Sequence, residues 1–257
     1  MNSASLHILV TGAGSGLGRG LCLHWARTGH HLILADRNPA ALRETMQLMG
    51  PAAERASAHE FDVASATQVQ GFLQALGNQP IHVLINDAGV QHVARLEEFP
   101  EDRWDQLVEV ILKGPFLLTR ALLPRMRAVG FGRIINIGSI HSLVASPFKS
   151  AYVAAKHAML GFSKVVALET ADVDITINTI CPAYIRTPLV EAQIHAQAQT
   201  RGIAEQEVID KVMLEPMPKK RFITVEEVAA TVEFLMSAHA RNITGQTIVI
   251  DGGWTAR

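Results

Sequence analysis

Short apolar runs rich in β-branched residues recur along the chain, and they constrain its fold more than any other feature. The runs lie at 6–10, 31–35, 81–85, 133–137, 175–180 and 247–250. Because their apolar residues are nearly continuous, they predict strands that are buried on both faces of a sheet. Segments with the apolar spacing of helices separate them, for example at 17–27, 67–76 and 150–169. This alternation predicts an α/β fold, in which helices cover both faces of a doubly wound parallel sheet.

The chain shows no linker that would divide it. No repeat, low-complexity stretch or run rich in Pro, Gly and Ser interrupts its 257 residues, so we expect a single domain over 1–257. The main irregular region follows the run at 175–180 and is rich in proline. Because ligands of open parallel sheets bind beyond the carboxyl ends of the strands, we expect 183–220 to form a substrate lid, helical over 189–199. A surface insertion without a role is the alternative.

Composition excludes several classes of protein. The chain has 23 Lys and Arg against 24 Asp and Glu, with no block of like charge, so it lacks the basic surface that general nucleic-acid binding requires. No apolar run reaches the ~18 residues of a membrane-spanning helix, and the first residues do not resemble a signal peptide. Two cysteines, Cys22 and Cys181, are too few for a disulfide framework, and the histidines lack the spacing of a metal site. We therefore expect a cytoplasmic protein without a metal, bound to neither nucleic acid nor membrane.

A glycine-rich turn follows the first predicted strand. Residues 11–18 read TGAGSGLG and lead into a predicted helix. Glycines there permit a tight turn and a close approach of backbone N–H groups to a pyrophosphate, which the helix N-terminus also attracts. The turn therefore predicts a dinucleotide site, with Gly12, Ser15, Gly16, Leu17 and Gly18 as candidate binding residues.

Acidic residues follow the next strands. Asp36 lies 18 residues after Gly18, close to the ~20-residue offset of a carboxylate that binds the adenosine ribose hydroxyls. Because a carboxylate there repels a 2′-phosphate, it favours NAD over NADP, although the adjacent Arg37 could tolerate that phosphate. An ordinary solvated acid at the end of a strand is the alternative for Asp36. Asp62 and Val63, after the next strand, are weaker candidates for the adenine pocket.

Tyr152 and Lys156 lie four residues apart in a predicted helix. Residues at this spacing share a helix face, so the ammonium of the lysine could favour the ionised phenol and make it a base. An exposed pair on a helix surface is the alternative reading of these two residues alone. Ser139 follows the strand at 133–137 and stands 13 residues before Tyr152. Its hydroxyl could hold a substrate oxygen while the tyrosine moves its proton.

These motifs, together with Asn86-Asp87-Ala88-Gly89, occur in the order and at the spacing of the short-chain dehydrogenase/reductase family, which the whole chain resembles. The resemblance implies a Rossmann-type fold and hydride transfer with a nicotinamide cofactor. It also implies catalytic roles for Ser139, Tyr152 and Lys156. The further cofactor-binding residues that it implies are Asn86, Ala88, Gly89, Pro182 and Thr187, besides Tyr152 and Lys156.

A narrower resemblance links several stretches, including 130–157 and the ending DGGWTAR, to bacterial D-3-hydroxybutyrate dehydrogenases. It implies NAD-dependent oxidation of a small 3-hydroxy acid to a 3-oxo acid, here acetoacetate, in a homotetramer. It also implies that Gln91, His141, Lys149 and Gln193 bind the substrate carboxylate beside Ser139 and Tyr152, which suits an anion because a cation and several hydrogen-bond donors converge. Two alternatives are a related dehydrogenase for another hydroxy acid or alcohol, and a non-catalytic NAD-binding regulator.

Three positions depart from the family pattern. Asp87 replaces the second Asn of Asn-Asn-Ala-Gly, Ala183 replaces a Gly after Pro182, and Ile111 aligns with the family's catalytic Asn. In the family that asparagine marks a distorted helical turn whose backbone carbonyl holds a water linked to the catalytic lysine. Pro115 has no N–H to donate to the carbonyl of Ile111. We therefore expect Pro115 to supply through the backbone what the asparagine supplies elsewhere.

Overall fold

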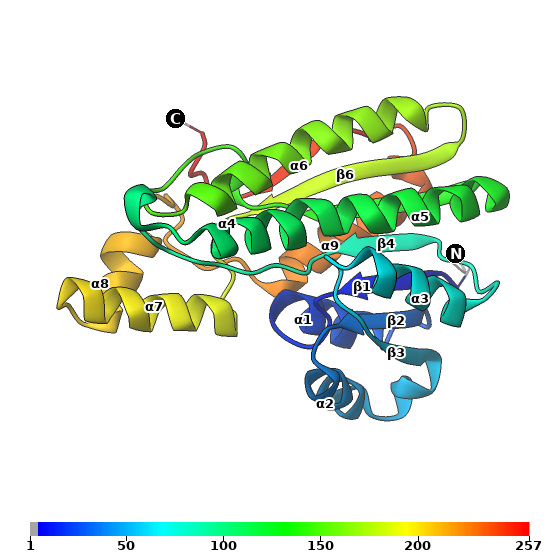
Figure 1. Ribbon diagram of the computed structural model, residues 1–257, viewed down its shortest axis with the longest axis horizontal. Helices are drawn as coiled ribbons and strands as arrows, with labels where there is room; N and C mark the ends of the chain where they lie inside the picture. Colours follow the sequence, from blue (N-terminus) through cyan, green and yellow to red (C-terminus); the bar gives the residue numbers. More distant parts are fainter. Residues whose placement is uncertain (1–4, 257) are drawn as a thin grey trace.

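The computed structural model describes residues 5–256, and of Leu189, Ala196, Thr200 and Arg201 only the backbone. Within them, seven parallel strands form one sheet in the order β3-β2-β1-β4-β5-β6-β7 (Figure 1). The strands are β1 (His7–Thr11), β2 (His31–Asp36), β3 (Ala56–Glu60), β4 (Val83–Asn86), β5 (Phe131–Ile137), β6 (Asp174–Pro182) and β7 (Thr247–Ile250). The predicted doubly wound α/β fold is confirmed. The edge strand β3 lacks an apolar run because its side chains lie partly in solvent, which is why hydrophobicity did not mark it.

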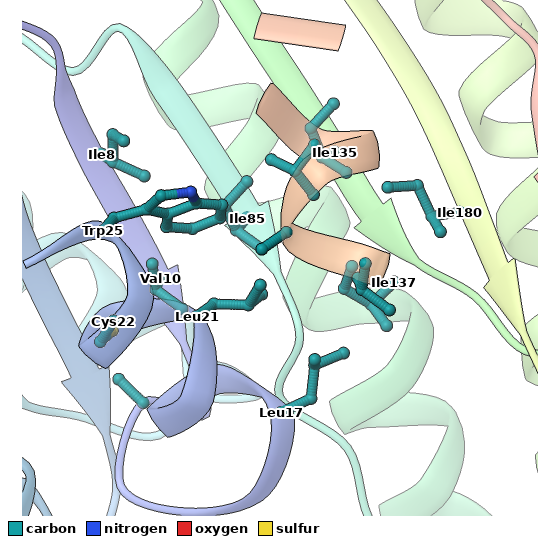
Figure 2. Close-up of a cluster of buried hydrophobic side chains, with 14 of the residues drawn as sticks. Ile8, Val10, Leu17, Leu21, Cys22, Trp25, Ile85, Ile135, Ile137 and Ile180 are labelled. Atoms are coloured by element: carbon teal, nitrogen blue, oxygen red, sulfur yellow. The ribbon is translucent and has the colours of Figure 1, made fainter. Parts of the chain in front are cut away.

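Helices cover both faces of the sheet. They are α1 (Gly16–Trp25), α2 (Pro39–Met49), α3 (Ala66–Leu76), α4 (Glu101–Val108), α5 (Gly114–Val129), α6 (Ser150–Glu169), α7 (Pro188–Arg201), α8 (Glu205–Val208) and α9 (Val225–Met236). Successive side chains of a strand point to opposite faces. Ile8 and Val10 therefore pack with Trp25 in one core under α1, α2 and α9, as Figure 2 shows, whereas Leu9 joins a second core under α3, α5 and α6.

The strand order places the reversal of the sheet between β1 and β4. Because β2 lies on one side of β1 and β4 on the other, the connections leave in opposite directions and open a crevice at the carboxyl ends of these strands. After β6 the chain leaves the sheet, and α7 and α8 project beyond it (Figure 1). The predicted helix at 189–199 is confirmed as part of α7. No helix of residues 5–256 is long and apolar enough to span a membrane.

A histidine cluster lies at the amino-terminal ends of the strands. His7 begins β1, stacks on His31 of β2 with ring centroids 4.7 Å apart, and meets His82 at 5.4 Å. Burial, and then the charges that His31 and His82 would carry, lower the pKa of His7. A proton on this ring is therefore bound less tightly in the folded protein than in the unfolded chain.

We expect this cluster to make the fold sensitive to acid. A pKa that folding lowers gives stability that is complete above the unfolded value of ~6.5 and is lost as the pH falls. His7→Phe keeps a stacked ring that cannot be protonated. The unfolding free energy lost between about pH 7.5 and about pH 5.5 should therefore be smaller in His7→Phe than in wild type. The difference should be less than about 1 kcal/mol, because the ring is only partly buried. Urea titrations measure this, with the exposed His239→Gln as the control. Equal acid sensitivity in wild type and His7→Phe would contradict the prediction.

Candidate active site

A cavity of about 520 Å³ lies at the carboxyl ends of the strands. It brings together most of the residues predicted from the sequence. Those that line it are Gly12, Ser15, Gly16, Leu17, Asp36, Asp62, Val63, Ala88, Gly89, Gln91, Ser139, His141, Lys149, Tyr152, Lys156, Pro182, Thr187 and Gln193. Cofactor and substrate candidates that lie more than a hundred residues apart in the chain thus share one cavity.

Two predicted residues, Gly18 and Asn86, do not line the cavity but support its wall. A Cβ on Gly18 would lie 2.5 Å from the carbonyl oxygen of Gly12, so only glycine lets α1 pack against the turn. The amide of Asn86 is buried, and its Nδ2 donates to Oδ1 of Asn136 at 2.8 Å. Asn136 in turn donates to the hydroxyl of Ser163 at 2.9 Å. This network connects β4 and β5 to α6 beneath the cavity.

The glycine turn fits a dinucleotide. Gly12 has a φ of +70°, and a Cβ there would lie 3.0 Å from Cα of Ala88, so the strand ends approach closely only because the side chain is absent. Ser15 precedes α1 without a side-chain cap bond, which leaves N–H groups of the first turn available for phosphate oxygens. The residues present would therefore hold the pyrophosphate of a nicotinamide dinucleotide.

Asp36 ends β2 and lines the same cavity. Its Oδ2 accepts a hydrogen bond from the N–H of Gly14 at 3.0 Å, and its Oδ1 accepts one from the N–H of Asn38 at 2.9 Å. These bonds fix the carboxylate at the rim of the cavity, and each oxygen keeps capacity for a further donor. Arg37 also lines the cavity.

Ser139, Tyr152 and Lys156 come together below the end of β5. Lys156 is buried, and its Nζ donates to the carbonyl oxygen of Ile137 and lies 5.7 Å from the ring centroid of Tyr152. The expected alignment on one helix face is confirmed.

Burial has a large effect on both ionisable groups of this pair. Burial raises the pKa of Tyr152 to about 12, and hydrogen bonding with Ser139 only partly opposes that rise. Burial also lowers the pKa of Lys156 to about 8. Desolvation disfavours the charged form of each group, the phenolate of Tyr152 and the ammonium of Lys156.

Lys149 is a buried cation beside this group. Its residue is only 7% exposed, its Nζ lies 3.4 Å from Oε1 of Gln193, and it faces the ring of Tyr184 at 5.6 Å from the centroid. Burial lowers the pKa of Lys149 to about 8. No carboxylate of residues 5–256 forms an ion pair with it. The chemistry of a buried ammonium without an anionic partner among these residues suits an anionic ligand.

His141 lies between the catalytic candidates and this cation. Its Nδ1 lies 3.4 Å from Oγ of Ser139, and its Nε2 lies 2.8 Å from Oγ of Ser146. Burial, and then the charges of Lys149 and His157, lower the pKa of His141 to about 4. The imidazole is therefore neutral near pH 7 and acts through hydrogen bonds.

Sequence reasoning missed two aromatic residues, one that lines the cavity and one that packs beside it. Tyr184 lines the cavity beneath Lys149, and Trp254 packs 6.0 Å from Tyr184 and 6.2 Å from His141. Both come from segments without helical or strand periodicity, the loop after β6 and the C-terminal segment after β7. Only the match of the ending DGGWTAR pointed to Trp254, and no signal marked Tyr184.

The helix that carries Ile111 is distorted at that residue. Glu109–Lys113 form a π-helical turn between α4 and α5, in which the N–H of Gly114 donates to the carbonyl oxygen of Glu109. Pro115 follows and has no N–H to offer to the carbonyls of Val110 or Ile111. The distorted turn expected from the family is thus present without the asparagine.

Residues 6–198 match the family model for short chain dehydrogenases. The D-beta-hydroxybutyrate dehydrogenase of Rhizobium meliloti is 43% identical over 253 residues, which cover 97% of this chain and 98% of that protein. A solved 4-hydroxyisoleucine dehydrogenase complexed with NADH has a TM-score of 0.87 and 28% identity, covering 98% of this chain and 100% of the other. An actinorhodin polyketide ketoreductase variant with NADPH has a TM-score of 0.92 and 29% identity, covering 98% of each chain. The chain is therefore an oxidoreductase of the short-chain dehydrogenase family.

Proposed function

We propose that this protein is an NAD-dependent dehydrogenase of a small 3-hydroxy acid, and that it converts D-3-hydroxybutyrate to acetoacetate. The observation that carries the proposal is the buried ammonium of Lys149, which has the amide of Gln193 nearby and lines the same cavity as Ser139 and Tyr152. An alcohol-oxidising site with a desolvated cation favours a substrate that carries a carboxylate. The 43% identity to a D-beta-hydroxybutyrate dehydrogenase supports the same substrate.

In this proposal some residues take part in proton transfer, and others position the substrate. Tyr152 takes the proton of the substrate hydroxyl, and Ser139 hydrogen-bonds that oxygen. Lys156 supplies the positive charge that favours the phenolate. Lys149 pairs with the carboxylate, which His141, Gln91 and Gln193 hold through hydrogen bonds. NAD held at the glycine turn would supply the acceptor for the hydride that leaves the carbinol carbon.

The direct test is the formation of NADH, followed by absorbance, with D-3-hydroxybutyrate and NAD. The L isomer and a neutral secondary alcohol of the same length serve as comparison substrates. We expect activity with the D isomer to exceed that with the neutral alcohol at least about 100-fold, because a charge-assisted contact contributes about 3 kcal/mol. Equal rates on acid and alcohol would remove the substrate assignment. Tight NAD binding without turnover would favour a regulator.

Asp36 is expected to select NAD over NADP. A carboxylate fixed by Gly14 and Asn38 accepts bonds from ribose hydroxyls and repels a 2′-phosphate. Asp36→Ser should weaken NAD binding about 10-fold. It should also reduce the ratio of NAD affinity to NADP affinity, since Arg37 lies beside Asp36. Dissociation constants of both cofactors measure the effect, with Asp62→Ser as a matched acid of the same cavity. An unchanged NAD-to-NADP ratio in Asp36→Ser would count against this role.

Pro115 is expected to matter for turnover and not for stability. Alanine at 115 restores an N–H and is the better helix residue, so Pro115→Ala should fold at least as stably as wild type. If the distorted turn supports proton movement to Lys156, turnover should fall several-fold and its pH profile should shift. Steady-state kinetics across pH and thermal unfolding measure both effects. Wild-type kinetics in Pro115→Ala would refute the hypothesis, and Ile111→Asn should add little.

We also propose a homotetramer in the cytoplasm and a lid formed by 183–220. Exposed apolar side chains on α5 and α6, namely Phe116, Val165 and Leu168, support subunit packing, because Leu168 alone is 80% exposed. Light scattering of the purified protein tests the assembly.

For the lid, slower hydrogen exchange of 183–220 on addition of NADH and substrate is the expected result.

A further inference from the structure

Asp87, the departure from Asn-Asn-Ala-Gly, places a carboxylate in the wall of the cofactor cavity. It follows β4 and lines the cavity with Gly12, Gly16 and Lys156. Its N–H donates to Oγ1 of Thr11 at 3.0 Å, which holds the residue against the end of β1. The side chain packs on the first turn of α1, because a Cβ on Gly18 would lie 2.8 Å from Oδ2 of Asp87. The backbone N–H of Gly18 lowers the pKa of this carboxyl.

Some neighbours of Asp87 favour its charged carboxylate, and others favour its neutral acid. Lys156 of α6 favours the carboxylate, whereas Asp36 of β2 opposes it. Tyr152 of α6 and the buried thiol of Cys22 in α1 face it and are uncharged near neutrality, since burial raises the pKa of both. No cation of residues 5–256 forms an ion pair with Asp87. Burial is the largest influence and raises the pKa of Asp87 to about 7.

A bound dinucleotide would disturb this balance. It brings a pyrophosphate to the glycine turn beside Asp87 and excludes water from the cleft, and both changes favour the neutral acid over the carboxylate. We propose that Asp87 binds the nicotinamide dinucleotide in its protonated form, so that binding takes up one proton from solvent. The proposal rests on the proposed cofactor and goes beyond it. The asparagine usual in the family is neutral at every pH and would leave cofactor affinity free of this coupling.

The expected size of the effect follows from the fraction of protein that is competent to bind. If only the protonated form binds tightly, the apparent dissociation constant is the intrinsic one divided by the protonated fraction. Above about pH 7.5 the affinity for NADH should then fall about tenfold per pH unit. Near pH 8 each bound NADH should take up close to one proton.

Calorimetric titration of wild-type protein with NADH tests the uptake without any variant. Titrations near pH 8 in buffers of different ionisation enthalpy give the number of protons bound. NADH dissociation constants between about pH 6 and about pH 9 then compare wild type, Asp87→Asn and Asp105→Asn. We expect Asp87→Asn to show no proton uptake and a flat profile, and Asp105→Asn, an exposed acid of α4 outside this cavity, to keep the wild-type slope.

Lys156 and Lys149 also titrate in this range, since burial lowers the pKa of each to about 8. Lys149 is unchanged in Asp87→Asn, so a fall in affinity caused by Lys149 would persist there at the same pH. For Lys156, the variants separate the two explanations. Asp87 stabilises the ammonium of Lys156, so Asp87→Asn lowers the pKa of that lysine. If loss of the lysine proton caused the fall in affinity, the fall would move to lower pH in Asp87→Asn instead of disappearing. That outcome, or zero proton uptake by wild type, overturns the proposal while leaving the cofactor assignment intact. Absence of NADH binding by wild type overturns both.

Discussion

Tyr152→Phe should reduce turnover about 10³-fold or more while leaving the affinity for NADH within about threefold of wild type. The substitution removes one oxygen, which is the only group of this side chain that can exchange a proton, and general acid–base catalysis contributes about 10²–10⁴-fold. The ring is retained, so its packing with Ala151, Ala155 and Met159 should survive. Steady-state kinetics and NADH binding on the same preparation measure the two quantities.

The matched control for this variant is Tyr184→Phe. Tyr184 is the other tyrosine of the chain, and it lines the same cavity. Because the ring of Tyr184, which phenylalanine retains, faces Lys149, we expect less than tenfold loss of kcat in Tyr184→Phe. Turnover in Tyr152→Phe close to that of wild type would show that another group moves the proton.

For Tyr152 to act as a base near neutrality, bound ligands must lower the pKa of its phenol. Burial raises the pKa of its phenol to about 12, and a shift to neutrality requires about 1.4 kcal/mol for each pKa unit. Spacing along a helix predicts that Lys156 lies on the same face, but it does not predict how much water the fold removes from both groups. We expect the positive nicotinamide of NAD⁺ to supply part of the shift.

Apolar runs in the sequence predicted six of the seven strands, including the edge strand β7 with its run TIVI. The same reasoning does not mark β3, whose sequence ASAHE contains no apolar run. The glycine turn predicted the cavity wall, because glycine at 12 and 18 is required by close backbone approach. Asn86, in contrast, carries a family motif and yet lies in a polar network below the cavity, which only the fold reveals.

Substrate-site residues were predictable only where a family motif carried them. Lys149 and Gln193 lie 44 residues apart, and their contact at 3.4 Å depends on the path of the loop after β6. Tyr184 and Trp254 come from segments without periodicity, and their packing is a property of tertiary structure. A residue type alone could not distinguish Lys149 from a solvated surface charge, because its burial decides its role.

Lys149→Met is the variant that should separate acidic from neutral substrates. Methionine keeps an unbranched apolar side chain but leaves a bound carboxylate without its cation, and removal of one partner of a desolvated pair costs about 2–5 kcal/mol. We expect kcat/KM for D-3-hydroxybutyrate to fall about 100-fold or more, mainly through KM, and kcat/KM for a neutral secondary alcohol to change less than threefold. Lys164→Met, an exposed lysine on α6, is the control and should match wild type on both substrates.

The pH profile adds a second, independent signature of the same residue. Burial lowers the pKa of Lys149 to about 8, so we expect its ammonium to predominate below that pH and kcat/KM for the acid to fall as the pH rises through about 8. Lys156 also titrates near 8, but it acts on every substrate, whereas Lys149 acts on the carboxylate. The additional fall seen with the acid, relative to the neutral alcohol, should therefore vanish in Lys149→Met. If that additional fall persists, or if Lys149→Met loses activity equally on both substrates, the lysine does not bind the carboxylate and the substrate is not an acid held at this position.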